Sequence, residues 1–271
     1  MSWRAIARKD LRDSARSRTL WLLLGGFLLL MVLPVVAFPS VVAPDPTGFV
    51  EFTQVVVSGF VPLVSIALGY KAVIGERESG SVKLLLSFPH SRRDLAVGKF
   101  VGRAVVLAAP LALALAAAGV AAYAVLGSLP AMRYTGVVLA SLGFGLAFLG
   151  LTLGLSMALE TSRRVTGAAI GAYVLFAMVW ETLVQVLVFA LFRFMDPRVV
   201  FDLPDWALFV KFLAPVEAYD RLVQALFDLG VAGGYTSGPW FVAAWVAPLV
   251  LLAWVVVPVA VGYRRFARSD M

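Results

Sequence analysis

The sequence predicts an all-α membrane protein with six transmembrane helices in a single domain spanning residues 1–271. The chain is 61% hydrophobic and only 14% charged, with a mean hydropathy of +0.92, which would leave too little polar surface to cover a soluble globule. Six apolar runs each reach the roughly 20 helical residues that cross about 30 Å of hydrocarbon. These runs do not alternate apolar and polar residues, so helices rather than barrel strands are expected. The predicted spans are 20–43, 49–74, 104–126, 136–159, 165–192 and 241–261.

The distribution of basic residues predicts the orientation of these spans. Eighteen of the 23 Lys and Arg residues lie before the first span, within 71–103 at the junction of the second and third, between the fourth and fifth, or after the sixth. Basic residues stay preferentially on the cytoplasmic side. We therefore expect a multi-pass protein of the cell membrane with both termini in the cytoplasm. The high pI then reflects orientation and attraction to anionic lipid, and a nucleic-acid partner is not expected.

Residues 1–18 precede the first span and have amphipathic spacing. Apolar side chains recur at helical intervals and basic ones occupy the other faces: Trp3, Ile6, Ala7, Leu11 and Ala15 against Arg4, Arg8, Lys9, Arg12 and Arg16. This pattern predicts a helix lying in the membrane interface. The alternative is a flexible basic tail that only fixes the topology.

The charged segment between the second and third spans is the most informative part of the chain. Gly80 suits the end of a helix and Phe88-Pro89 marks a second break, so a short helix of about two turns fits within 80–91. Ser91 or Asp94 can then cap the helix that enters the third span. Two acids in the last turn before Gly80, Glu76 and Glu78, oppose the helix dipole. They call for basic partners such as Arg77, Arg92, Arg93 or a group on another protein.

Four motifs in this segment carry a resemblance to a known family. They are Glu76-Arg77-Glu78-Ser79-Gly80, Leu84-Leu85-Leu86-Ser87-Phe88-Pro89, Arg92 or Arg93, and Gly98-Lys99. In this order the chain resembles the permease subunits of type-2 ABC transporters, including the branch associated with nitrous-oxide-reductase maturation and related archaeal exporters. It departs in having Ser81 where Thr is common and His90 where an apolar residue is usual. The basic start, six spans, long outer segment and basic end agree with the same resemblance.

The resemblance implies that 80–91 is a coupling helix seated in a groove of a cytoplasmic ABC ATPase subunit. The residues it assigns to that contact are Glu76, Glu78, Gly80, Val82, Leu85, Phe88, Pro89, Arg92 and Arg93. A smaller second contact is expected at Glu160, Arg163 and Arg164, whose alternative reading is a turn that fixes topology. The implied complex is a dimeric exporter containing a second permease copy or a homologue, with ATP and Mg bound on the ATPase subunit.

The chain itself is not expected to be an enzyme or to bind a cofactor or metal. It has no Gly-x-x-x-x-Gly-Lys-Ser/Thr run to hold phosphates, and its one histidine, His90, falls in the predicted cytoplasmic loop. A Ser/His catalytic pair and a His-Glu-x-x-His zinc site are therefore excluded. A second reading of the same loop keeps the protein as a non-transporting scaffold or assembly factor that recruits some other cytoplasmic protein.

Two further regions are candidates for a substrate path. Glu181 and Gln185 lie one turn apart near the middle of the fifth predicted span, where an ionisable group is expensive and invites a functional role. The alternative for Glu181 is a protonated, purely structural carboxyl group. Residues 196–238 contain several Pro and Gly and predict short outer or re-entrant helices. Small-residue pairs such as Gly150 with Gly154 and Gly167 with Gly171 predict close helix packing.

Overall fold

The computed structural model describes residues 3–79, 91–192, 203–227 and 239–268. Within these ranges the helices are joined by short turns and there is no strand, so the predicted all-α class is confirmed. The elements are α1 Trp3–Ala15, α2 Arg18–Ala37, α3 Pro39–Val42, α4 Pro46–Gly69, α5 Ile74–Glu78, α7 Arg92–Leu126, α8 Ala131–Ala158, α9 Ser162–Tyr173, π-helix η1 Val174–Val179, α10 Trp180–Phe192, α11 Asp205–Phe212, α12 Pro215–Phe227, 3-10 helix η3 Trp240–Val242 and α13 Ala247–Arg268.

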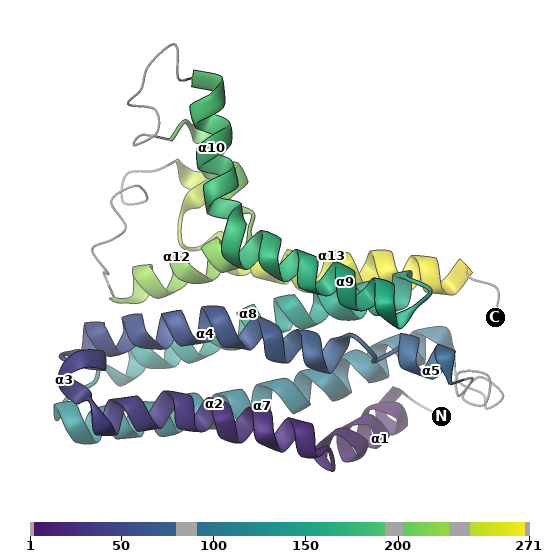
Figure 1. The fold of residues 1–271 in the computed structure, drawn as a ribbon, viewed down its shortest axis with the longest axis horizontal. Coiled ribbons are helices and arrows are strands. Elements are labelled where there is room, and N and C mark those ends of the chain that lie inside the picture. Colours follow the sequence, from purple (N-terminus) through teal and green to yellow (C-terminus); the bar gives the residue numbers. More distant parts are fainter. Residues whose placement is uncertain (1–2, 80–90, 193–202, 228–238, 269–271) are drawn as a thin grey trace.

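Five helical stretches in the described part of the chain are long and apolar enough to cross a membrane. They are Pro46–Glu78, Arg92–Leu126, Ala131–Ala158, Ser162–Leu191 and Ala247–Arg268, and a shorter apolar helix, Leu24–Ala37, lies within α2. Together with α2 these stretches account for the six predicted spans. Most of them lie side by side as a bundle in Figure 1.

Three spans depart from simple straight helices. The first is interrupted at Phe38, whose φ of −135° is not helical, before Pro39 starts the short α3. The fifth passes through the π-helix η1, after which α10 turns away from the bundle (Figure 1). The sixth begins at Ala247 rather than at 241, and it continues to Arg268. Apolar composition alone could not separate the 3-10 turn at Trp240–Val242 from the helix that follows it.

Part of the bundle core lies between α12 and α8. The Phe144 ring stacks on Tyr219 with centroids 4.8 Å apart, and the hydroxyl oxygens of Ser141 and Tyr219 lie 3.1 Å apart. Leu226, further along α12, meets Gly136 near the beginning of α8. Helix α12 therefore runs antiparallel to α8, from the middle of α8 toward its beginning.

Close helix packing depends on glycines in α8. A Cβ at Gly150 would lie 2.8 Å from the Cα of Val255, and one at Gly154 would collide with the carbonyl oxygen of Pro258. These small residues bring the backbones of α8 and α13 together, as membrane helix pairs often require. At Gly167 and Gly171 a Cβ would meet nothing within 4 Å.

One end of the bundle gathers the elements that flank the charged loop. Helix α1, helix α5, the first turns of α7 and α9, and the last turn of α13 all lie at this end (Figure 1). We call it the loop end.

Candidate coupling site and outer cavity

A buried charge network at the loop end joins three helices that are distant in sequence. The Lys99 ammonium of α7 lies 2.9 Å from Asp10 Oδ1 of α1 and 2.5 Å from Glu76 Oε1 of α5. The Arg103 guanidinium lies 2.9 Å from Asp10 Oδ2. The Asp10 side chain is only 3% exposed and that of Lys99 9%. Two acids and two bases therefore compensate one another where unpaired charges would be strongly destabilising.

Two glycines of α7 allow α1 to approach closely enough for this network to form. A Cβ at Gly98 would lie 2.8 Å from the carbonyl oxygen of Trp3, and one at Gly102 would lie 3.0 Å from the Asp10 side chain. Gly98 thus provides the space and the adjacent Lys99 provides the charge. This gives the Gly98-Lys99 pair a physical role in fixing α1.

Glu78 faces a different neighbour. Its carboxylate accepts hydrogen bonds from the backbone N–H of Ser162 at 2.7 Å and from the Ser162 hydroxyl at 2.5 Å. Ser162 is the first residue of α9, so the carboxylate lies at a helix N-terminus, where a negative charge is favoured. Glu78 therefore ties the end of span two to the beginning of span five.

The backbone joining α4 to α5 is held from a third direction. The Ser156 hydroxyl of α8 accepts from the backbone N–H groups of Val73 and Ile74 at 3.2 and 3.1 Å, and it donates to the Tyr70 carbonyl at 3.0 Å. A buried serine thus satisfies backbone groups that the break between α4 and α5 would leave without partners. The position and orientation of α5 are consequently set by α7, α8 and α9 together.

The partners of the two glutamates differ from the arginines named by the sequence analysis. Glu76 pairs with Lys99, and Glu78 bonds to Ser162. Arg92 instead donates to the carbonyl oxygens of Phe266 and Ala267, both at 2.8 Å, near the C-terminus of α13, where such carbonyls lack helical partners. The expected cap of α7 is confirmed, because Ser91 and Asp94 form a reciprocal capping box.

The predicted contact residues fall into two groups. Glu76, Glu78, Arg92 and Arg93 lie at the loop end, whereas Gly80, Val82, Leu85, Phe88 and Pro89 lie outside the described residues. The second predicted contact, Glu160 with Arg163 and Arg164, connects α8 to α9 at the same end, next to Ser162. Its Glu160–Arg164 pair, at 3.3 Å, is exposed and contributes little stability. The Glu78–Ser162 contact therefore joins the two segments that were predicted to meet a partner.

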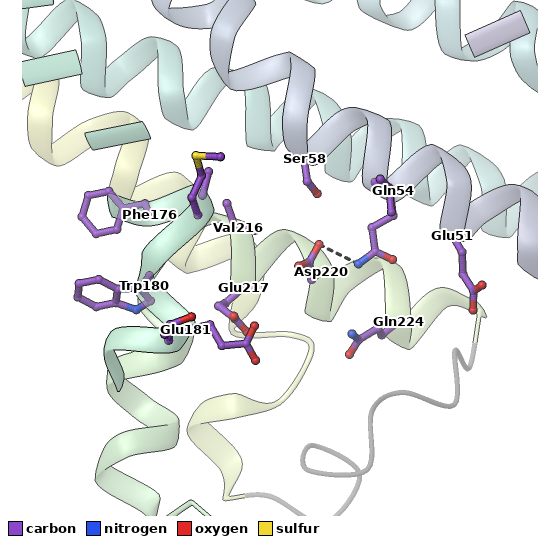
Figure 2. Close-up of a pocket in the computed structure, with 14 residues that line it drawn as sticks. Glu51, Gln54, Ser58, Phe176, Trp180, Glu181, Val216, Glu217, Asp220 and Gln224 are labelled. Carbon is purple, nitrogen blue, oxygen red and sulfur yellow. Dashed lines mark hydrogen bonds between the residues drawn. The ribbon is translucent and has the colours of Figure 1, made fainter. Parts of the chain in front are cut away.

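A second feature is an open cavity of about 570 Å³ lined by residues of α4, η1, α10 and α12 (Figure 2). We call it the outer cavity, because it lies toward the opposite end from the loop end. Its lining combines apolar side chains with eight polar ones: Glu51, Gln54, Ser58, Glu181, Thr182, Glu217, Asp220 and Gln224. Such a polar cavity within an apolar bundle is typical of a small-molecule site or path.

The carboxylates of the outer cavity have distinct environments. Asp220 Oδ1 accepts from the Gln54 amide at 2.8 Å (Figure 2), and burial raises the pKa of Asp220 to about 6 despite this hydrogen bond. Lys211 of α11 lies 2.6 Å from Glu181 and 3.7 Å from Glu217. Near neutral pH the cavity therefore holds an excess of negative charge, part of which can be removed by mild acidification.

Glu181 and Gln185 share a face as predicted, but not in the interior of the bundle. The Gln185 amide donates to Glu181 at 3.5 Å, and Glu181 occupies the first turn of α10, where that helix turns away from the bundle. Its side chain is 55% exposed. Lys211, which pairs with Glu181, and Asp220, which lines the same cavity, were not singled out from sequence. The available signal was their charge within a predicted outer segment that is flanked by apolar spans.

Comparison with known proteins finds similar sequences over nearly the whole length of the chain. Residues 4–271 match the family described as ABC-2 family transporter protein. The probable ABC transporter permease protein NosY of Pseudomonas aeruginosa is 28% identical over 278 aligned positions, covering 98% of each chain. The protein of the same name from Stutzerimonas stutzeri is 31% identical over 282 positions, covering 97% of each.

Proposed function

This chain belongs to the ABC-2 family of transporter permeases, and we propose that it couples ATP hydrolysis on a separate cytoplasmic subunit to export of a substrate. It is a multi-pass membrane permease subunit of an ABC transporter. In the proposed complex the ATPase subunit binds ATP and Mg, and segment 80–91 of this chain contacts that subunit. Both termini and the loop end then face the cytoplasm, in keeping with the concentration of basic residues there.

The observation that carries this proposal is the anchoring of α5. Glu76 connects α5 to α1 and α7, and Glu78 connects it to α9. A displacement of the adjoining segment by a partner would thus reach three helices, α1, α7 and α9, through short, charged contacts. Helical elements held in this way transmit a rigid movement rather than absorbing it locally.

We propose that Glu76 and Glu78 act as positioning residues for the coupling segment. Their carboxylates are engaged within the chain, so direct contact with the ATPase falls mainly to 80–91 and to the exposed Arg163 and Arg164. Apolar Val82, Leu85 and Phe88 would form the centre of that contact and Lys83, Arg92 and Arg93 its rim, as in other protein interfaces.

A second permease copy, or a homologue, is proposed to pack against the fifth span. Only 11% of the apolar window in Ser162–Leu191 is buried within the chain, compared with 61% in Ala131–Ala158. The faces at Gly167 and Gly171 are open. A second chain would cover a span that its own bundle leaves largely uncovered.

The outer cavity is proposed to be part of the substrate path. It contains the polar groups of the predicted pathway residue Glu181, with Gln185 bonded beside it. It lies between α12 and the π-helix of span five, and π-helical turns often occur at functional sites. Movement of α9 from the loop end would change the shape of this cavity.

The experiment that tests coupling compares two substitutions in the chain co-expressed with its ATPase subunit. Leu85→Asp places a charge in the proposed apolar contact and should abolish co-purification of the two subunits. The matched control is Met132→Asp at the opposite end, where the side chain is 91% exposed; it should leave the complex intact. If Leu85→Asp is recovered in the membrane and still co-purifies normally, segment 80–91 is not the contact.

The same preparation separates transport from scaffolding. Glu181→Gln, which leaves the loop end unchanged, should alter the ATPase rate of the assembled complex if the outer cavity belongs to the substrate path. An ATPase subunit that hydrolyses ATP at the same rate alone and in an intact complex with this chain would favour the scaffold alternative.

A further inference from the structure

The exposed side of α1 carries a continuous basic stripe. Arg4, Arg8, Arg12 and Arg16 recur every four residues, so they lie on one face of the helix. With Lys9 and one acid, Asp13, they line a shallow surface cavity of about 590 Å³ along α1. We call these five cations the α1 stripe. Asp13 reduces its net charge to +4, which remains strongly attractive to anions.

The opposite side of α1 is fixed against α7, so the stripe cannot turn away. Ile6, Asp10 and Ser14 are buried at 6%, 3% and 6% exposure, and Asp10 is held by Lys99 and Arg103. Ile6 and Leu11 of the predicted amphipathic helix thus pack on protein. Contact with a membrane would be made by the exposed side of α1, which is predominantly basic.

The height of α1 relative to the spans matches the headgroup layer. It packs beside Gly98 and Gly102, a few residues before the apolar run that begins at 104, and a rise of 1.5 Å per residue puts this contact within about 10 Å of the hydrocarbon. At its other end α1 leads through Ser17 directly into the first span. The polar layer on each side of a bilayer is roughly 5–8 Å thick.

We propose that the α1 stripe binds the phosphate groups of anionic phospholipids in the leaflet at the loop end. Guanidinium groups hold phosphate oxygens with two parallel hydrogen bonds, and clustered Lys and Arg beside a span attract anionic lipid. The spacing of about 6 Å between successive stripe residues allows neighbouring headgroups to be held together. The bound lipid thus contacts α1, the helix whose Asp10 pairs with Lys99 in the buried charge network.

The test measures lipid binding to the purified chain alone. The chain in neutral detergent is titrated with phosphatidylglycerol or with phosphatidylcholine, and bound lipids are counted by native mass spectrometry. The triple variant Arg8→Gln, Lys9→Gln, Arg12→Gln should lose at least about tenfold in phosphatidylglycerol affinity, given the size of the attraction per basic residue. Phosphatidylcholine binding should not change. These side chains are exposed, so the thermal midpoint in detergent should be retained.

The matched control removes the same charge at the same end of the bundle. Arg264→Gln, Arg265→Gln, Arg268→Gln changes three exposed arginines of α13 and should preserve the phosphatidylglycerol affinity within about twofold, which corresponds to about 0.4 kcal/mol of binding free energy. Equal losses in both variants would mean general charge attraction and would overturn the site. Unchanged lipid binding in the α1 variant, with loss of the ATPase subunit on co-purification, would assign the stripe to a protein contact instead. Since lipid binding is measured without an ATPase, its result does not depend on the proposed coupling.

Discussion

At the scale of single residues, Lys99 has the most demanding environment in the described structure. It is 7% exposed and pairs with both Asp10 and Glu76, residues that are 66 positions apart in the chain. Removing one member of a buried ion network leaves its partners charged in a medium of low polarity. The lysine of the Gly98-Lys99 motif is therefore explained by the two buried carboxylates that it neutralises.

We predict that Lys99→Gln will strongly destabilise the protein. Glu76 would lose its cation while remaining mostly buried, and an unpaired buried charge costs roughly 3–5 kcal/mol. The measurement is the thermal midpoint of the purified chain in detergent. Lys71→Gln is the control, because Lys71 is exposed and its ammonium lies 5.5 Å from the centroid of the Tyr70 ring, outside the buried network. A Lys99 variant as stable as the Lys71 variant would contradict a structural role for the network.

Sequence reasoning reached the residues of this site but not their pairing. The motif identified Glu76, Glu78 and Lys99 as important, yet the pairing depends on α1 returning to α7, a contact across 89 positions between Asp10 and Lys99. One local signal was available. Asp10 lies between Ile6 and Ser14 at helical spacing, and an acid on the packed face of an amphipathic helix indicates a buried basic partner.

At the scale of elements, apolar runs predicted which segments are helices but not how the helices bend. The capping residues of α7 and the existence of α12 follow from local chemistry, and both are confirmed. The π-helix η1 and the turn of α10 away from the bundle depend on tertiary contacts such as the Trp180 indole donating to the Val210 and Lys211 carbonyls at 3.1 and 3.2 Å. No local pattern in the fifth span encodes those partners.

The glycines of α8 and α9 allow a prediction about helix packing. Gly154→Ala should destabilise the isolated chain by about 1–3 kcal/mol, because the added methyl group meets the backbone of Pro258 and overpacking has a cost of this order. Gly167→Ala should not, since nothing lies within 4 Å of its Cβ position, and the change improves helix propensity. Thermal unfolding of both variants, as monomers in detergent, gives the comparison. Equal destabilisation would contradict the close packing of α8 on α13.

At the scale of the whole molecule, the charges and the uncovered surface divide the protein into three regions. The loop end gathers anchored charges, the outer cavity holds hydrogen-bonded carboxylates, and the fifth span presents an apolar side with little cover from its own chain. A membrane bundle gains little from hiding apolar surface from lipid, and close packing of small residues is what favours helix association there. The open faces at Gly167 and Gly171 meet that requirement for a second chain.

A cross-linking experiment can locate this second chain, because the protein has no cysteine of its own. Ile170, between the two open glycines, is 51% exposed, and Leu113 on α7 is 71% exposed. We predict that Ile170→Cys in membranes will give dimers with a short bis-maleimide reagent and that Leu113→Cys, the control on another span, will remain monomeric. Adding Gly167→Leu to Ile170→Cys should reduce the dimer yield several-fold, since a large side chain would separate helices whose association depends on small residues. Dimers formed equally well from both single-cysteine variants would reflect random collision in the membrane and would remove the fifth span as the contact between permease copies.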